Sequence, residues 1–124
     1  MYRISKEFHF SSSHHLCDMP EGHPCATMHG HNYVVIVELE SEKLDETGMV
    51  LDYHELAPIK RWLDETCDHQ HLNSVLPFNP TAENMAMYFY GQFMRILGRD
   101  SHAFLKLKAV HVKETPKTIA TYYE

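Results

Sequence analysis

The sequence predicts an α+β domain in which two amphipathic helices pack on one face of a four-stranded antiparallel sheet, in the order β-β-α-α-β-β. Apolar and polar residues alternate near both ends of the chain, and the middle carries two apolar stripes at helical spacing. The 124 residues, 44% hydrophobic and 23% charged, suit a single domain over residues 1–124. Placing both helices on one face of the sheet is the most economical way to bury the two stripes.

The first two strands are predicted over residues 1–10 and 32–41. The first alternates, and the second is rich in β-branched and aromatic residues. The apolar residues on one face of the first strand are Tyr2, Ile4, Phe8 and Phe10. Residues 17–28, which contain Pro20 and Pro24, are expected to form a loop. A turn at Thr47-Gly48 and a short extended piece over residues 49–52 follow.

The first helix is predicted from about residue 55 to residue 66. Its apolar stripe consists of Leu56, Ile59, Trp62 and Leu63. Pro58 must lie in the first turn, where the missing N–H costs least. The second helix is expected to be capped by Thr81, with Glu83 near the positive end of the dipole, and to close at Gly98. Its stripe consists of Met85, Phe89, Phe93, Ile96 and Leu97. Residues 104–114 and 118–123 are the last two predicted strands.

Three histidines, His14, His29 and His31, are predicted to bind one metal ion. In an extended segment alternate side chains point the same way, so His29 and His31 project side by side across Gly30. His14 follows the first alternating stretch and could supply a third nitrogen. Three neutral imidazoles suit zinc, and three protein ligands leave a fourth position open for water or substrate, as in catalytic sites. The alternative is chance proximity among 11 histidines.

Three further candidates for chemistry lie in the connections. Cys25 could act as a nucleophile or, as a thiolate, as a base, or it could be an inert small side chain. Asp68 could fix the tautomer of His69 and raise its basicity, or the two could belong to an ordinary polar loop. Glu114 ends the strand on the face of Val110 and Val112. It is either a surface residue or a fixed acceptor for a ligand.

Composition excludes several classes of function. The formal charge is −6 and the 11 basic residues are scattered, so nothing indicates binding to nucleic acid. No apolar run approaches the roughly 20 residues of a membrane span, and the alternating N-terminus is unlike a signal peptide. The odd count of three cysteines, without secretory features, indicates reduced thiols and a cytoplasmic protein.

Six motifs together resemble the 6-pyruvoyltetrahydropterin synthase / 6-carboxytetrahydropterin synthase family, in the order of that family and nearly end to end. They are FHFSSSH at residues 8–14, CATMHGHNY at 25–33, GMVLDY at 48–53, DHQHLN at 68–73, NPTAEN at 79–84 and VKET at 112–115. The tunnelling fold (T-fold) of this family agrees with the predicted order of elements. The resemblance also implies a homohexamer, a dimer of trimers whose sheets close into barrels, with active sites at subunit interfaces.

The resemblance implies a role for each candidate residue. The zinc ligands would be His14, His29 and His31. Catalysis would involve Cys25 together with Asp68 and His69. Glu114 matches the carboxylate that anchors the 2-amino and N3–H groups of a pterin, and Thr81 and Glu83 match a stretch near the pterin pocket. The position after the first zinc histidine is often Arg in the family and is His15 here, although alignment from Phe10 favours His14 as the ligand.

The spacing around Cys25 sorts the branches of the family. Three residues separate Cys25 from His29, which resembles the bacterial 6-carboxy-5,6,7,8-tetrahydropterin synthases of queuosine biosynthesis. The pyruvoyl-forming synthases usually have a longer gap, and a third branch carries Glu in place of Cys25. The implied substrate is 7,8-dihydroneopterin triphosphate. The alternatives are a 6-pyruvoyltetrahydropterin synthase, a non-catalytic zinc-binding protein on this fold, and a metal-dependent hydrolase, although no carboxylate base stands at motif spacing for the last.

Overall fold

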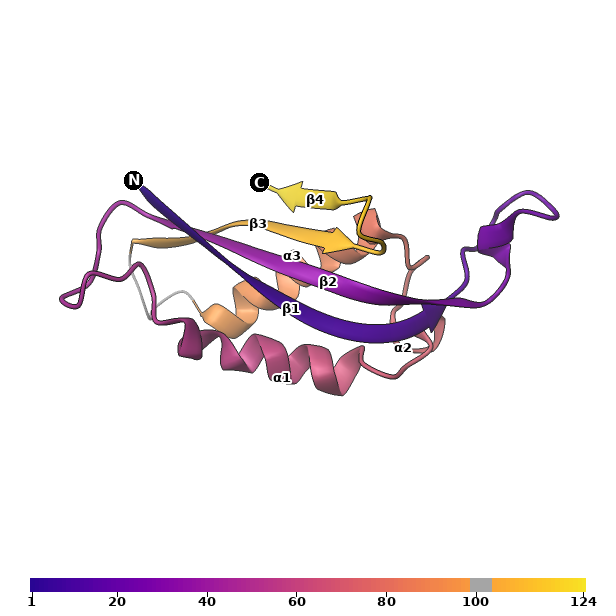
Figure 1. The fold of residues 1–124 in the computed structure, drawn as a ribbon, viewed down its shortest axis with the longest axis horizontal. Helices are drawn as coiled ribbons and strands as arrows, with labels where there is room; N and C mark the ends of the chain where they lie inside the picture. The colour runs from indigo at the N-terminus through magenta and orange to yellow at the C-terminus, as the bar shows by residue number, and fades with distance from the viewer. Residues whose placement is uncertain (99–103) are drawn as a thin grey trace.

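A computed structural model of the chain, which describes residues 1–98 and 104–124, confirms the predicted fold class (Figure 1). The four strands form one antiparallel sheet in the order β1-β2-β3-β4. Their bounds are β1 Tyr2–His14, β2 His29–Ser41, β3 Leu105–Lys113 and β4 Ala120–Tyr123. The helices between β2 and β3 are α1 Ala57–Thr66, the single turn α2 Leu72–Val75, and α3 Ala82–Leu97. Two short 3-10 helices, η1 Pro24–Ala26 and η2 Tyr53–Leu56, complete the described elements.

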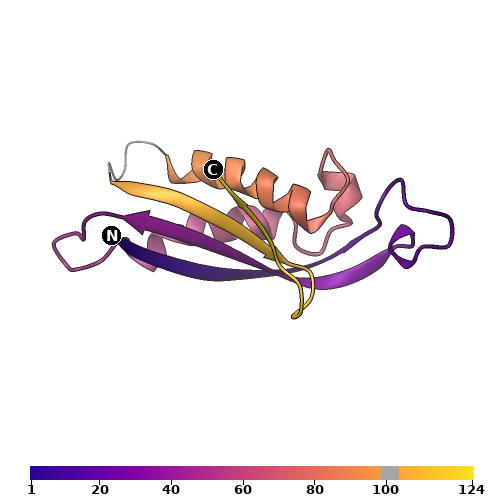
Figure 2. The ribbon, with the colours of Figure 1, turned by 90° about the horizontal axis from the view of Figure 1, so that it is seen from above.

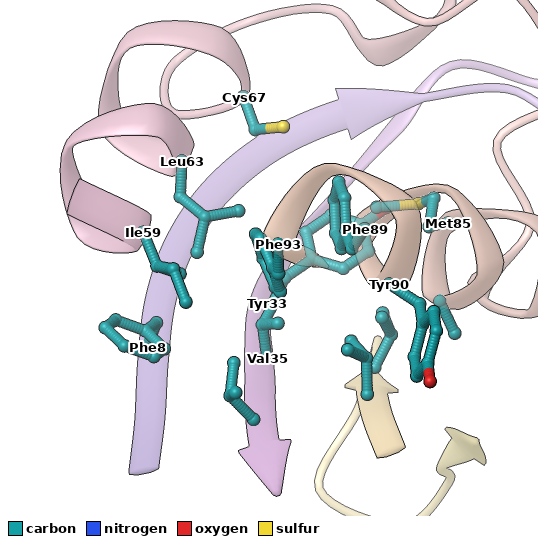
Figure 3. Packing of buried hydrophobic residues seen from close by; sticks show 14 of the residues in the cluster. Phe8, Tyr33, Val35, Ile59, Leu63, Cys67, Met85, Phe89, Tyr90 and Phe93 are labelled. Atoms are coloured by element: carbon teal, nitrogen blue, oxygen red, sulfur yellow. The ribbon is translucent and has the colours of Figure 1, made fainter. Parts of the chain in front are cut away.

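Both long helices lie on the same face of the sheet (Figure 2). The predicted stripes point inward: Ile59 and Leu63 of α1, and Met85, Phe89 and Phe93 of α3, are at most 1% exposed. Figure 3 shows Phe89 and Phe93 directed toward Tyr33 of β2. Burying each such side chain contributes about 1.5–3 kcal/mol, so this contact surface fixes the helices against the sheet.

The first two strands are longer than the alternating apolar pattern predicts, and they meet at the histidines. β1 continues through the polar residues 11–13 to His14, and β2 begins at His29. The alternation itself persists there: Ser12 and His14 are buried, whereas Ser11 is exposed. Ser12 donates a hydrogen bond to the buried carbonyl of Cys67. Polar side chains that find partners inside therefore extend a strand beyond its last apolar residue.

Local capping explains where the first helix begins. The side chain of Asp52 accepts from the His54 backbone N–H and starts the 3-10 turn η2, so α1 begins at Ala57 with Pro58 in its first turn. Residues 49–52 are not a strand, and β4 begins at Ala120, two residues later than predicted. Thr81 caps α3, and Gly98, at a φ of 69°, ends it, both as predicted. Within the two described ranges, no helix has the length and hydropathy needed to cross a membrane.

Candidate functional site

The three predicted metal histidines converge at the end of the β1–β2 hairpin, on the face that carries the helices. His14 and His29 are direct partners in the antiparallel register, and His31 follows two residues along β2. The ring centroids lie 4.6–5.0 Å apart and the rings are steeply inclined to one another. One nitrogen from each ring lies within 4.8 Å of the others, a spacing that allows all three to bind one ion.

Backbone carbonyls orient two of these rings. Nδ1 of His14 donates to the carbonyl of Pro80 at 2.9 Å, and Nδ1 of His29 donates to the carbonyl of Thr27 at 2.7 Å. Since a carbonyl can only accept, the Nε2 atom of each neutral ring carries a lone pair. A carbonyl that accepts from the ring nitrogen facing away from the metal fixes the tautomer of a metal-binding histidine.

The donor set fits a metal ion better than it fits an apolar core. The two Nε2 atoms of His14 and His29 lie 3.0 Å apart, close to the roughly 3.3 Å expected between two imidazole ligands of tetrahedral zinc. Nε2 of His31 is buried and has no hydrogen-bond partner among the described residues. A buried polar atom without a partner is costly, and a cation between the three nitrogens would satisfy it.

Burial keeps these rings in the form that binds metal. His14 is 1% exposed, and burial lowers its pKa to about 4. Burial, followed by the neighbouring His29, also lowers the pKa of His31. Both rings are therefore neutral near pH 7, as a metal ligand must be.

The lowered pKa of His14 predicts an acid-sensitive metal-free protein. The unfolded chain takes up a proton at this ring near pH 6.5, whereas the folded chain does so only near pH 4. Unfolding is therefore favoured as the pH falls through this window, by about 3 kcal/mol in total. Urea unfolding of metal-free wild type and His14→Gln at several pH values measures the difference. Parallel pH profiles for the two proteins would contradict the assignment.

A cavity lined by carboxylates lies within electrostatic reach of His29. Glu114, which follows β3, lines a cavity of about 250 Å³ together with Val112, Ala82, Glu83 and residues 118–120. The pKa of Glu114 is raised overall. Burial and the negative charge of Glu83 raise it, and they outweigh His29 and a hydrogen bond with the Ala82 backbone, which lower it. The predicted ligand-binding carboxylate is thus half-buried and within electrostatic reach of the predicted metal ligands.

The segment before α3 connects the two parts of the site. Pro80 orients His14, and the hydroxyl of Thr81 accepts from the Asn84 backbone N–H at 3.1 Å to start the helix. Glu83 stands in the first turn of α3, at the rim of the Glu114 cavity. The structure therefore brings Thr81 and Glu83 together with the histidines and Glu114.

Asp68 and His69 form the predicted hydrogen-bonded pair, at the edge of β1. Asp68 accepts from the Ser11 backbone N–H at 2.9 Å and from Nδ1 of His69 at 2.8 Å, and these bonds lower its pKa. His69 donates its own N–H to the Ser11 carbonyl, so the segment runs along the free edge of β1. The His69 side chain is 84% exposed and lines a surface depression with Ser11, His31 and Asn32. Within one chain, the pair faces outward.

Cys25 lies in η1, within the loop over residues 15–28 that projects beyond the end of the sheet (Figure 1). It is half-buried, and its backbone is held on both sides: its N–H donates to Nδ1 of His23 at 3.1 Å, and its carbonyl accepts from the Leu16 N–H at 2.8 Å. Cys67 is fully buried, which raises the pKa of its thiol to about 12, in keeping with an inert core residue.

His15 has partners of its own, separate from the three clustered rings. Its Nδ1 lies 3.2 Å from Nε2 of His71, and Nδ1 of His71 lies 2.9 Å from the hydroxyl of Ser13. Neither His71 nor the orienting carbonyls of Thr27 and Pro80 were identified from the sequence. A backbone carbonyl has no side-chain signature, and the second histidine of DHQHLN could have suggested only His71.

Comparison with known proteins agrees with this arrangement. The family model described as 6-pyruvoyl tetrahydropterin synthase matches residues 3–124. A 6-carboxy-5,6,7,8-tetrahydropterin synthase from Haemophilus influenzae is 31% identical over 150 residues, covering 100% of both chains. The human 6-pyruvoyl tetrahydrobiopterin synthase is 29% identical over 144 residues, covering 97% of this chain and 90% of the human one.

The fold agrees as well. The solved structure of Caenorhabditis elegans 6-pyruvoyl tetrahydropterin synthase matches with a TM-score of 0.83 and 28% identity, over 99% of this chain and 95% of that one. The T-fold that the resemblance implies, and the order of strands and helices predicted from the residues, are therefore both confirmed. On the extent of the family match and the agreement of the whole fold, the protein belongs to the 6-pyruvoyl tetrahydropterin synthase family.

Proposed function

We propose that the protein is a zinc-dependent 6-carboxy-5,6,7,8-tetrahydropterin synthase that converts 7,8-dihydroneopterin triphosphate and one water to 6-carboxytetrahydropterin, acetaldehyde and triphosphate. The observation that carries the proposal is the cluster of His14, His29 and His31, with its unpartnered buried nitrogen, beside the half-buried carboxylate of Glu114. The choice of the carboxy product is supported by the three residues between Cys25 and His29 and by the Haemophilus influenzae relative.

The three histidines would hold the metal. Zinc at this position would supply Lewis-acid polarisation of the hydroxyl groups on the substrate side chain. The carbonyls of Pro80 and Thr27 keep two of the rings oriented with Nε2 toward the shared centre. The pKa of His14, lowered to about 4, keeps that ring neutral throughout the range in which the enzyme would operate.

Glu114 would bind the pterin ring. The 2-amino and N3–H groups of a pterin form an edge with two donors, which one carboxylate accepts in a bidentate manner. The cavity around Glu114 opens beside Glu83 and within electrostatic reach of His29, so a ring held there would direct its side chain toward the metal ligands. Recognition and chemistry would thus occupy adjoining parts of one site.

Cys25 as a thiolate and His69 would move protons between C6 of the pterin and the first two carbons of its side chain. Asp68 accepts the Nδ1 proton of His69, which leaves Nε2 as the basic atom. Because His69 points outward from the edge of β1, it would serve a site completed by a neighbouring copy of the chain. This placement supports a homo-oligomer, which we propose to be a hexamer with active sites between subunits.

Incubation with 7,8-dihydroneopterin triphosphate followed by mass spectrometry tests the reaction. The 6-carboxytetrahydropterin mass together with acetaldehyde supports the proposal. A product that retains all three side-chain carbons would instead identify a 6-pyruvoyltetrahydropterin synthase, which the 29% identity to the human enzyme makes the second candidate. Absence of any product from zinc-loaded protein would leave a non-catalytic zinc-binding protein on this fold.

The cellular setting is part of the same proposal. On the resemblance to the bacterial carboxy-forming synthases, the product would enter queuosine biosynthesis. The three cysteines, Cys17, Cys25 and Cys67, are all unpaired. Free thiols are typical of reducing compartments, which supports a cytoplasmic location.

Removing Glu114 is expected to weaken pterin binding without disturbing the metal. Glu114→Ala leaves both ring donors without an acceptor, so affinity should fall at least tenfold, or by about 1.4 kcal/mol or more. Glu114→Gln offers one acceptor and an unwanted donor, and should recover little. Titration of a non-reactive pterin analogue into both zinc-loaded variants measures the loss. Unchanged affinity would mean that the ring edge is read elsewhere, with Glu83 as the next candidate.

A further inference from the structure

Two asparagine side chains hold the first residues of the loop that carries Cys25. Asn73 accepts from the His15 backbone N–H through Oδ1 and donates to the His15 carbonyl through Nδ2, both at 2.9 Å. Asn79 accepts from the Cys17 backbone N–H at 2.8 Å, with Nδ2 at 3.5 Å from the Cys17 carbonyl. The two side chains thus bind the backbone of alternate residues, His15 and Cys17.

This arrangement replaces a missing strand. β1 ends at His14, and within the described part of the chain no strand pairs with residues 15–17. A side-chain amide offers one acceptor and donors, as a peptide group does, so each asparagine imitates the pair of hydrogen bonds that a neighbouring strand would make. Asn73 is part of α2, and the carbonyl of Asn79 accepts from Asn84 of α3 at 3.0 Å, so both anchors belong to the helical layer.

Residues 15–17 are hydrogen-bonded directly to the backbone of Cys25. Leu16, between the two held residues, donates its N–H to the Cys25 carbonyl at 2.8 Å. On the other side, the Cys25 N–H is bound to Nδ1 of His23. The helical layer therefore holds residues 15–17, and residue 16 holds the backbone of Cys25.

We propose that Asn73 and Asn79 are positioning residues for Cys25: they set the place of its thiol through the backbone of residues 15–17. The inference rests on the proposed function in taking Cys25 as the reacting thiol. Loops of this length without regular structure of their own are usually functional and need internal ties to hold one conformation. Here the internal hydrogen bonds come from the side-chain amides of Asn73 and Asn79, and neither amide has to touch the substrate.

The hydrogen bonds predict different responses to the same isosteric change. Asn79 uses mainly its acceptor, so Asn79→Asp keeps the 2.8 Å bond to the Cys17 N–H. Asn73 uses acceptor and donor equally, so Asn73→Asp replaces a donor with a carboxylate oxygen facing the His15 carbonyl. Asn79→Asp should therefore behave nearly as the parent, and Asn73→Asp should behave as Asn73→Ala.

The experiment follows Cys25 in zinc-loaded protein carrying Cys17→Ser as the parent. Cys67 is fully buried, so Cys25 is the thiol that iodoacetamide can reach. The alkylation rate, kcat and KM are measured for Asn73→Ala, Asn73→Asp, Asn79→Ala and Asn79→Asp. Ser41→Ala is the matched control. The Ser41 hydroxyl also makes two hydrogen bonds to the backbone, both to Lys43, and it lies at the opposite end of β2 from the histidines.

The two alanine variants and Asn73→Asp are expected to alkylate at least threefold faster, because a loosened loop exposes the half-buried thiol. Their kcat should fall at least tenfold, with KM within twofold and zinc content unchanged. Alkylation and kcat equal to those of Ser41→Ala would overturn the inference, and so would a lower kcat with unchanged alkylation. A parent that converts no pterin, together with variants that still alkylate faster, would refute the proposed function and leave the positioning role supported.

Discussion

Replacing His29 or His31 with alanine is expected to remove most of the bound zinc and to abolish turnover. Two remaining imidazoles cannot hold the ion against water, since catalytic zinc sites use three protein ligands. His14→Ala should have the same effect, because its Nε2 lies 3.0 Å from that of His29. Metal analysis of the purified variants, with turnover measured in parallel, gives the result.

The neighbouring histidine provides the control. His15 lies next to His14 in the sequence, yet its ring contacts His71 and its backbone is held by Asn73. His15→Ala should therefore retain zinc close to the wild-type content. Loss of zinc in His15→Ala equal to that in His14→Ala, or full occupancy in His14→Ala, would show that the ligand set is wrong.

Cys25→Ala is expected to retain zinc and to bind a pterin analogue normally while turnover falls by orders of magnitude. A group that moves protons in the transition state contributes to kcat and not to ground-state affinity. The thiol belongs to η1, whereas the metal ligands belong to β1 and β2, so its removal leaves their hydrogen bonds to Pro80 and Thr27 in place.

Cys67→Ala is the control that shows the effect of removing a thiol from the core, without any role in catalysis. Cys67 is fully buried and the pKa of its thiol is raised to about 12, so truncation should cost stability and leave kcat near normal. Measurement of kcat and of the thermal midpoint for both variants distinguishes the two roles. Full zinc with near-normal turnover in Cys25→Ala would reduce Cys25 to a structural residue and remove the proton-transfer scheme built on it.

Alternation and helical spacing were sufficient to predict the fold, because the residues that follow them are the residues that the fold buries. Tyr33, Val35, Val37 and Leu39 alternate along β2 and all are fully buried. The same rule gave too short a β1, since Ser12 and His14 are buried polar residues whose partners, the carbonyls of Cys67 and Pro80, come from distant parts of the chain. Hydropathy along the sequence cannot foresee those partners.

The candidate site was predictable to the extent that its geometry is local. His29 and His31 share a face through the two-residue period of a strand, and the sequence alone indicates this. The position of Asp68 and His69 depends on pairing of their segment with Ser11 across more than fifty residues. The outward exposure of His69 at the edge of β1 is a product of tertiary structure, which motif order does not encode.

Because His14 and His29 are paired directly across β1 and β2, changes of chain length have unequal effects along this hairpin. An insertion among residues 15–24 lengthens a connection whose two ends are already fixed side by side, so the three rings keep their places. An insertion of one residue within β1 or between His29 and His31 turns the following side chains of that strand to the opposite face of the sheet. The loop can therefore vary in length among relatives, whereas the strand segments that carry the histidines must keep their residue count.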